Sequence, residues 1–367
     1  MSLNMRDGVN GLEGIVAAET VLSEVDGEAG RLVIRGRSLD ELSDWTFEEI
    51  IVLLWSGFFE TMPDDLTAAL GVARSEVFEE MAGLDRRLAE RAPIEVMRAL
   101  TARLSDGNDL GTALRLVAAP AVFTAAAIRA RMGETPLRPD PERGHACDIL
   151  RMTRGNLASA AEVKALDAYL VTVADHGLNA STFAARVTAS TLAGLTSAVL
   201  SGISALKGPL HGGAPGPVIE MLDGVGSPGQ ARVWLEGALD RGDRLMGFGH
   251  RVYKVRDPRA DALKRAVRAL THASNTPPAR LQLAEAVEKA ALEVLRERKP
   301  DRSLQTNVEL YTALILEALA FPASAFTCVF AMGRVAGWIA HAREQVQGGR
   351  LIRPQSRYVG PIPRAAA

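Results

Sequence analysis

Helical patterning dominates this chain and leaves little room for a sheet. Beyond about residue 35, apolar residues recur at three- and four-residue spacing, and strand-like alternation almost vanishes. Alanine is abundant and aromatic residues make up only 5% of the chain, which favours closely packed helices. No alternation of strands with helices and no internal repeat is visible. The predicted fold class is therefore mainly α, and 367 residues are enough for two domains.

Local signals predict where several helices begin. Thr46 and Glu49 have the spacing of a capping box that opens a helix through residues 50–55, and Ser159 and Glu162 open residues 163–174 likewise. Prolines at 258, 277 and 278 stand where first helical turns are expected.

The first 35 residues differ from the rest. Residues 14–22 and 30–34 are rich in Ile, Val, Thr and Leu and flank a polar turn at 25–30. This pattern predicts a short N-terminal β-hairpin at about 14–35.

One stretch, residues 187–206, could be either a membrane span or a buried helix. It has no charged residue, but it contains seven Ser or Thr and two Gly, and it lacks aromatic anchors at its ends. We expect a buried helix whose small residues allow close packing. No signal peptide is apparent, and no membrane association is expected.

Charge and cysteine content exclude further classes. The net charge is only −2 and no Lys/Arg run stands out, so nucleic-acid binding is not expected. Cys147 and Cys328 lie far apart without a CxxC motif, which argues against a disulfide framework or a zinc ribbon. A cytoplasmic location is the expectation.

Breaks in the pattern suggest two domains. Pro- and Gly-rich segments cluster at 207–216, 224–229 and 275–278, and the part between them is richer in charge than its flanks. We expect a large helical domain of residues 1–211 and 307–367, with a small helical domain of residues 212–306 inserted into it.

Four turns carry the residues of chemical interest. They read Asp-His-Gly-Leu-Asn at 175–179, Gly-Pro-Leu-His-Gly-Gly at 208–213, Gly-Phe-Gly-His-Arg at 247–251 and Asn-Val-Glu at 307–309. Side chains on turns can point into a cleft, and glycines let a ligand approach the backbone. Imidazoles, a carboxylate and nearby arginines suit acid/base chemistry on a small polyanion, so an enzyme is predicted.

Each residue also has an ordinary interpretation. His211 near a helix N-terminus could be a neutral hydrogen-bond donor to a carbonyl oxygen, or could merely bond a backbone carbonyl. Glu309 could be a general base or only a charge at a helix start. Arg259 could lie on a solvated helix face. A metal site is not expected, because no two histidines are spaced i,i+4 and no HExxH occurs.

Taken together, these pieces resemble the citrate synthase family. Gly-Pro-Leu-His-Gly-Gly-Ala at 208–214, Gly-Phe-Gly-His-Arg-Val-Tyr at 247–253 with Asp-Pro-Arg at 257–259, and Asn-Val-Glu at 307–309 look like its three active-site signatures. Asp-His-Gly-Leu-Asn-Ala-Ser-Thr at 175–182, Gly333-Arg334 and Arg353-Pro354 resemble its oxaloacetate-binding elements. The likeness covers nearly the whole chain.

The resemblance implies a nearly all-helical homodimer whose two domains close over the substrates. It implies condensation of acetyl-CoA with oxaloacetate and water to citrate and CoA, an acyl transfer in which the acyl group becomes an alkyl group, without a cofactor. The implied catalytic residues are His211, His250 and Glu309. Oxaloacetate would be held by His176, Asn179, Arg259, Arg334 and Arg353, with Arg353 from the partner subunit. The expected CoA contacts are Gly247, Gly249, Arg251, Lys254 and Asn307.

One departure from the family pattern bears on activity. Where the family usually has aspartate, this chain has Glu309. The extra methylene moves the carboxylate, so the site is either adapted to glutamate, slow, or inactive; we expect an adapted, active enzyme. The alternatives that stay open are a 2-methylcitrate synthase that uses propionyl-CoA, since one methylene is decided by only ~1–3 kcal/mol, and a catalytically impaired ligand sensor.

Overall fold

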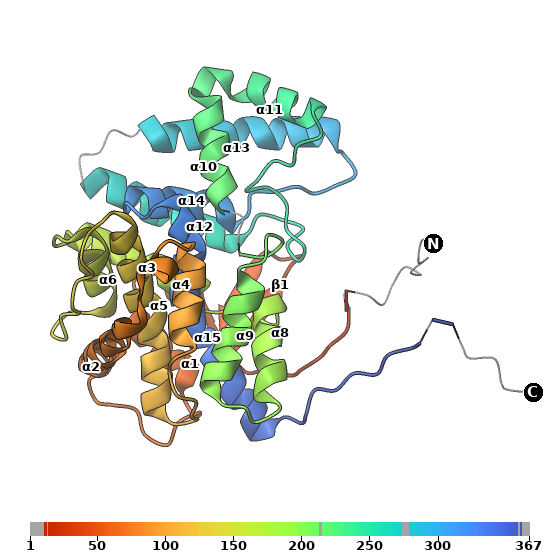
Figure 1. Cartoon of the computed structure of the whole chain (residues 1–367). Coiled ribbons are helices and arrows are strands. Elements are labelled where there is room, and N and C mark those ends of the chain that lie inside the picture. Colours follow the sequence, from red (N-terminus) through yellow and green to blue (C-terminus); the bar gives the residue numbers. More distant parts are fainter. Residues whose placement is uncertain (1–10, 13, 213–214, 274–278, 359, 362–367) are drawn as a thin grey trace, which may run out of the picture.

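The computed structural model describes residues 11–12, 14–212, 215–273, 279–358 and 360–361. It is mainly helical, as the sequence predicted, with one small sheet at the N-terminal end (Figure 1). The strands are β1 (Ser23–Asp26), β2 (Arg31–Ile34) and β3 (Arg37–Ser38). The α-helices are α1 (Phe47–Trp55), α2 (Leu66–Glu79), α3 (Arg86–Ala89), α4 (Pro93–Thr101), α5 (Leu110–Arg131), α6 (His145–Arg154), α7 (Ala160–Val173), α8 (Ala180–Ala189), α9 (Leu195–Leu206), α10 (Pro215–Val225), α11 (Ala231–Asp240), α12 (Pro258–Ala273), α13 (Ala279–Arg298), α14 (Val308–Ala318) and α15 (Phe326–Gly348).

The predicted helix starts are confirmed. In α1, Thr46 Oγ1 accepts the Glu49 N–H at 3.3 Å, and a Glu49 carboxylate oxygen accepts the Thr46 N–H at 2.7 Å. Ser159 and Glu162 form the same box at the start of α7. Pro258 is the first residue of α12. Pro277 and Pro278 lie outside the described residues, directly before the first residue of α13.

The hairpin exists, but its first strand was misplaced. The prediction put that strand at residues 14–22, whereas β1 starts at Ser23 and pairs antiparallel with β2, Ser23 opposite Ile34 and Asp26 opposite Arg31. Residues 14–22 are not in a strand; instead Thr20 Oγ1 and the Val21 N–H bond to the Glu344 carboxylate on α15. Apolar content without the alternation of a half-buried strand misled the prediction.

The uncharged stretch at 187–206 is two helices, not one. α8 ends at Ala189 and α9 begins at Leu195, with the turn between them passing through Leu192 at φ 65° and Gly194 at φ 101°. These left-handed conformations end a right-handed helix, and the two helices then pack against each other. A hydrogen bond of 2.7 Å between the Thr188 and Ser201 hydroxyls joins them.

Two long helices form the centre of the core. In α5 every residue from Thr112 to Arg129 except Arg115 is buried, and in α15 most residues from Phe326 to Ala342 are. Both are long and apolar enough to cross a membrane, but 83% of the apolar window of α5 and 78% of that of α15 lie inside the protein. Helices that are apolar on all sides are expected at the centre of a large helical fold.

The upper part of the molecule is a separate helical layer. In Figure 1, α10, α11 and α13 lie together above α12 and α14, and the other helices form the body below. Because α14 packs against α10 and α13 as well as against α12 and α7, it connects this layer to the body. The predicted division into residues 212–306 and the remainder stays a prediction.

A buried acid at the start of α1 should make stability depend on pH. Asp167 on α7 is 8% exposed and accepts the Phe47 N–H at 3.0 Å. Burial, aided by Glu48 and Glu49, raises the pKa of Asp167 to about 7, while the Phe47 N–H opposes the rise.

The folded protein therefore binds this proton more tightly than the unfolded chain does, and the stabilisation is lost as the pH rises through about 7. Asp167→Asn keeps an acceptor for Phe47 but cannot titrate. We expect wild-type unfolding free energy to fall, relative to this variant, by about 2–3 kcal/mol between pH 5 and pH 8. Urea unfolding at both pH values measures it; parallel pH profiles for the two proteins would contradict it.

Candidate active site

The turns singled out in the sequence converge between the helical layer and the body. His176 lies in the turn between α7 and α8, and His250, Tyr253 and Arg259 lie in or just after the loop 247–257 that precedes α12. The His176 and His250 rings are 5.6 Å apart between centroids, and the Tyr253 ring is 4.8 Å from His250. Segments some 75 residues apart in the chain thus share one site.

The backbone fixes the proton position on His250. Its Nδ1 accepts the N–H groups of Val252 and Tyr253, both at 3.1 Å. A neutral ring that accepts at Nδ1 carries its hydrogen on Nε2, which lies 3.4 Å from Nη2 of Arg259. Burial, and then the charge of Arg259, lowers the pKa of His250 to about 4. At neutral pH this ring is therefore an uncharged donor.

His176 is held by a tyrosine that ends the 247–253 motif but that the sequence reasoning gave no role. Its Nε2 is 3.1 Å from the hydroxyl of Tyr253, which is 1% exposed. Burial, followed by the charges of Arg259 and Arg334, keeps the pKa of His176 well below its ordinary value. His176 is thus also neutral, and Tyr253 links it to the His250 loop.

Two buried guanidiniums lie within electrostatic range of each other. Arg259 is 3% exposed and bonds the Asp257 carboxylate through Nε at 3.0 Å and Nη2 at 2.8 Å, so it does not lie on a solvated face. Arg334 on α15 is 1% exposed and donates from Nε to the Val173 carbonyl at 2.6 Å. Burial lowers the pKa of Arg334 to about 10; nearby Asp175 opposes this and Arg259 adds to it. Two buried like charges favour an anion between them.

His211 is oriented by two further residues, Ser181, which lies in the 175–182 motif but was given no role, and Trp338, which the sequence reasoning missed. Its Nε2 is 2.8 Å from Oγ of Ser181, and that hydroxyl also receives the indole N–H of Trp338 at 3.2 Å. Because Ser181 occupies the Nε2 edge of the ring, the Nδ1 edge is left for a ligand. The pKa of His211 is lowered to about 4, first by burial and then by Arg334, with smaller effects of Arg251 and Arg259. Burial, more than a helix dipole, keeps this ring neutral.

Glu309 is in the first turn of α14 but is not the residue that caps it. The N-cap is Asn307, whose side-chain oxygen accepts the Glu309 N–H at 2.9 Å. Burial raises the pKa of Glu309, while Arg244, the Gly247 N–H, Asn307 and Arg259 oppose the rise. A half-buried carboxylate with a raised pKa is suited to accept a proton near neutral pH. Arg244 carried no motif signal.

The two glycines of the 247–251 motif shape the loop. Gly247 and Gly249 have φ of 87° and 81°, which favour glycine. The Gly249 N–H donates to the Gln305 carbonyl at 2.7 Å, and Asn307 donates from its side chain to the Gly249 carbonyl at 2.8 Å. These bonds set the His250 loop beside the start of α14. Asn307 is 4% exposed, and its predicted CoA contact stays a prediction.

Other predicted residues lie at the edge of the site or outside it. Asn179 caps α8: its oxygen accepts the N–H groups of Ser181 and Thr182, and its amide donates to Thr182 Oγ1 at 3.0 Å. Arg251 and Lys254 are exposed. Arg353 is exposed too, on the segment after α15 that runs away from the body (Figure 1).

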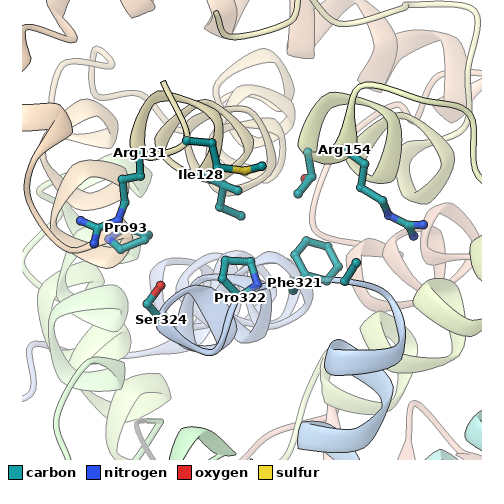
Figure 2. A pocket seen from close by; sticks show the side chains of 10 residues that line it. Pro93, Ile128, Arg131, Arg154, Phe321, Pro322 and Ser324 are labelled. Atoms are coloured by element: carbon teal, nitrogen blue, oxygen red, sulfur yellow. The ribbon is translucent and has the colours of Figure 1, made fainter. Parts of the chain in front are cut away.

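A cavity of about 570 Å³ is separate from this site. It lies among the ends of α4, α5 and α6 and residues 320–324, as Figure 2 shows. The guanidiniums of Arg131 and Arg154 stand at its two ends and are engaged elsewhere, Arg131 with the carbonyls of Glu90 and Arg91 and Arg154 with Glu162. Its wall is mostly apolar.

Among the described residues, no group of three His, Cys, Asp or Glu side chains could hold a metal ion.

Comparison with known proteins identifies the family. Residues 11–355 match the family model described as citrate synthase, C-terminal domain. The chain belongs to the citrate synthase family. It is 39% identical over 368 residues to the citrate synthase of Haloferax volcanii, which covers 95% of each chain. It is 35% identical over 366 residues to citrate synthase 2 of Bacillus subtilis, 96% of this chain and 95% of that one.

Solved structures agree with the family. The citrate synthase of Thermotoga maritima superposes with a TM-score of 0.82 at 33% identity, covering 97% of both chains. That of Thermoplasma acidophilum, in ternary complex with carboxymethyl coenzyme A and oxaloacetate, gives a TM-score of 0.84 at 28% identity, also covering 97% of both. The predictions of a citrate-synthase-type transferase and of a mainly α fold are confirmed.

The titration of the site yields a prediction about pH. His211 and His250 titrate near pH 4, so neither changes charge between pH 8 and pH 6. Glu309 has a pKa above its ordinary 4.5 and, if it is the base, must be ionised. We expect kcat/KM for acetyl-CoA to fall on the acid side with an apparent pKa above 4.5. A Glu309→Gln variant should show no such limb in its residual activity; the same limb in both proteins would contradict the assignment.

Proposed function

We propose that this chain condenses acetyl-CoA with oxaloacetate and water to give citrate and CoA, using no cofactor. One observation carries the proposal: the His176 and His250 rings lie 5.6 Å apart beside the buried guanidinium of Arg259, 3.4 Å from His250 Nε2, and the charge of Arg259 also acts on His211 and Glu309. Two neutral imidazoles and a carboxylate of raised pKa around an anion-binding arginine are the groups that an enolisation and condensation need.

Oxaloacetate would lie against Arg259 and Arg334, with His176 beside it. Planar guanidiniums bind carboxylates with defined geometry, and a dianion would relieve the repulsion between the two buried cations. The Thermoplasma acidophilum relative was solved with oxaloacetate and a CoA analogue bound, which supports the same ligands here. Asn179 acts by capping α8, and Arg353 completes the clamp from the partner subunit.

The chemistry would follow in three steps. Glu309 removes a proton from the acetyl methyl group while His211, held at Nε2 by Ser181 Oγ, donates a hydrogen bond to the thioester oxygen. The enol carbon attacks the ketone of oxaloacetate, and His250 donates from Nε2 to the ketone oxygen, which becomes the hydroxyl of citryl-CoA. Water cleaves the thioester, releasing citrate and CoA.

The assembly belongs to the same proposal. We infer a cytoplasmic homodimer in which residues 212–306 form a small domain that closes over the substrates and supplies CoA contacts. The support for the dimer is the segment after α15, which leaves the body with Leu351 56% and Tyr358 72% exposed. Gly247, Gly249, Arg251, Lys254 and Asn307 would lie along the CoA side.

Release of CoA thiol in the presence of oxaloacetate tests the function. A thiol reagent should report turnover with acetyl-CoA, with kcat/KM higher than for propionyl-CoA. A preference for propionyl-CoA would make the enzyme a 2-methylcitrate synthase, the alternative that relatives named citrate synthase do not favour. A protein that binds oxaloacetate in calorimetry but releases no thiol with either thioester would be a sensor.

Substitution of Glu309 should separate its two possible roles. If Glu309 is the base, Glu309→Gln keeps the fold and the oxaloacetate affinity but lowers kcat by about 100-fold or more. If it is only a charge at a helix start, the cost is about 0.3–1 kcal/mol of stability with turnover intact. Glu309→Asp should also lose activity, because a site adapted to glutamate no longer brings the carboxylate to the methyl proton. A gain of activity with aspartate would indicate a degraded site.

The origin of Arg353 can be tested by mixing subunits. Arg353→Leu and His250→Ala homodimers should each be nearly inactive. If Arg353 acts across the interface, a mixed dimer has one site with both residues intact and one with neither, so purified mixed dimers should have about half of the wild-type activity and a random equimolar exchange about a quarter. Arg350→Leu, three residues earlier, serves as control and should complement nothing. Absence of restoration in verified mixed dimers would show that each chain supplies its own arginine.

A further inference from the structure

A carboxylate in the middle of α13 joins the segments that carry the proposed catalytic residues. Glu288 is 5% exposed, and an unpaired carboxylate so deeply buried would be strongly destabilising. It is instead held by three donors: Arg256 Nη1 at 2.7 Å, Lys264 Nζ at 3.0 Å and the Tyr311 hydroxyl at 2.6 Å. Burial alone would raise its pKa, but Tyr311, Lys264 and Arg256 outweigh burial and lower it to about 2.

The three donors come from three different parts of the site. Arg256 lies in the loop between His250 and Arg259. Lys264 is on α12, whose second residue is Arg259, and its ammonium also lies 5.3 Å from the centre of the Tyr311 ring. Tyr311 is on α14, two residues after Glu309. One side chain of a fourth element, α13, therefore connects all three.

We infer that Glu288 is a positioning residue, which sets the separation between the His250 loop and the first turn of α14. The inference rests on the proposed roles of His250 and Glu309. In the condensation the enol made by Glu309 must meet the ketone held by His250, so the two segments must keep a fixed spacing. A misplacement of ~1 Å at such a centre costs on the order of 100-fold in rate.

The fold has a second connection, which should let a variant at Glu288 fold. The Val308 N–H donates to Asp257 Oδ2 at 3.1 Å, and Arg256 also pairs with Asp261 at 2.6 Å. Loss of the Glu288 carboxylate would therefore leave loop and helix attached but less well aligned. A Glu288 variant that folds but turns over more slowly would therefore indicate a positioning role and not a purely structural one.

The test uses the whole enzyme with Glu288→Gln. The amide keeps the size of the side chain but has only one acceptor oxygen for the three donors. We expect kcat to fall about 10- to 100-fold, with a smaller change in the oxaloacetate KM. With acetyl-CoA deuterated in its methyl group, the primary isotope effect on kcat should rise, because removal of the proton by Glu309 becomes more rate-limiting.

Two variants sharpen the result. Glu285→Gln is the matched control, since Glu285 lies on the same helix and pairs with Arg268 and with Lys264 at 3.5 Å, but with neither the loop nor α14. It should keep the wild-type kcat and isotope effect. Tyr311→Phe removes only the link to α14 and should lower kcat and raise the isotope effect to a lesser degree.

The outcomes that overturn the inference are distinct from those that overturn the function. If Glu288→Gln matches Glu285→Gln, or if lost kcat tracks the folded fraction with an unchanged isotope effect, Glu288 does not position the site. If Glu288→Gln does not fold, Tyr311→Phe decides, and wild-type behaviour in it overturns the inference. Failure of the proposed function itself would appear as a wild-type protein that releases no CoA thiol.

Discussion

The carboxylate of Asp257 is the interaction on which the geometry of the site depends. It is 1% exposed and accepts the backbone N–H, Nε and Nη2 of Arg259 as well as the N–H of Val308. It thereby compensates a buried cation and joins the His250 loop to the helix of Glu309. Removing one partner of a buried pair costs about 3–5 kcal/mol, so neither Asp257 nor Arg259 can be changed without disturbing its surroundings.

The charges around this carboxylate explain the protonation of the site. Arg334 donates to a backbone carbonyl, and Asp175 lies nearby without being its hydrogen-bond partner. The two buried guanidiniums therefore have fewer directly bonded carboxylates than charges, which leaves a surplus of positive charge. The surplus lowers the pKa of His176, His211 and His250 beyond what burial does. Neutral imidazoles can donate a hydrogen bond without adding charge, and a dianion is the ligand that completes the electrostatic balance.

How much of this site the sequence could predict depends on how far apart in the chain the interacting residues lie. Capping boxes at Thr46 and Ser159 were predictable because they involve residues three apart. His176, His250 and Arg259 were found because glycine, proline and aspartate next to them mark turns. Trp338 and Arg244 were missed because each sits in an ordinary helix or loop pattern, whereas Ser181 and Tyr253 lie within the quoted motifs but were given no role. Ser181 has a role only because the fold brings it to His211, which is 30 residues away in the chain.

By itself, the sequence determined the helical class, the family, a few helix starts and the set of residues able to do acid/base chemistry, because these depend on local periodicity and on contiguous motifs. It did not locate the start of the hairpin, before which Thr20 and Val21 bond Glu344, or the break between α8 and α9, where the Leu195 N–H donates to the Gly107 carbonyl. Both depend on partners distant in the chain. The tertiary structure alone decided the protonation of the imidazoles, the raised pKa of Glu309 and the junction at Glu288. Burial and electrostatics act through space, and no spacing along the chain encodes them.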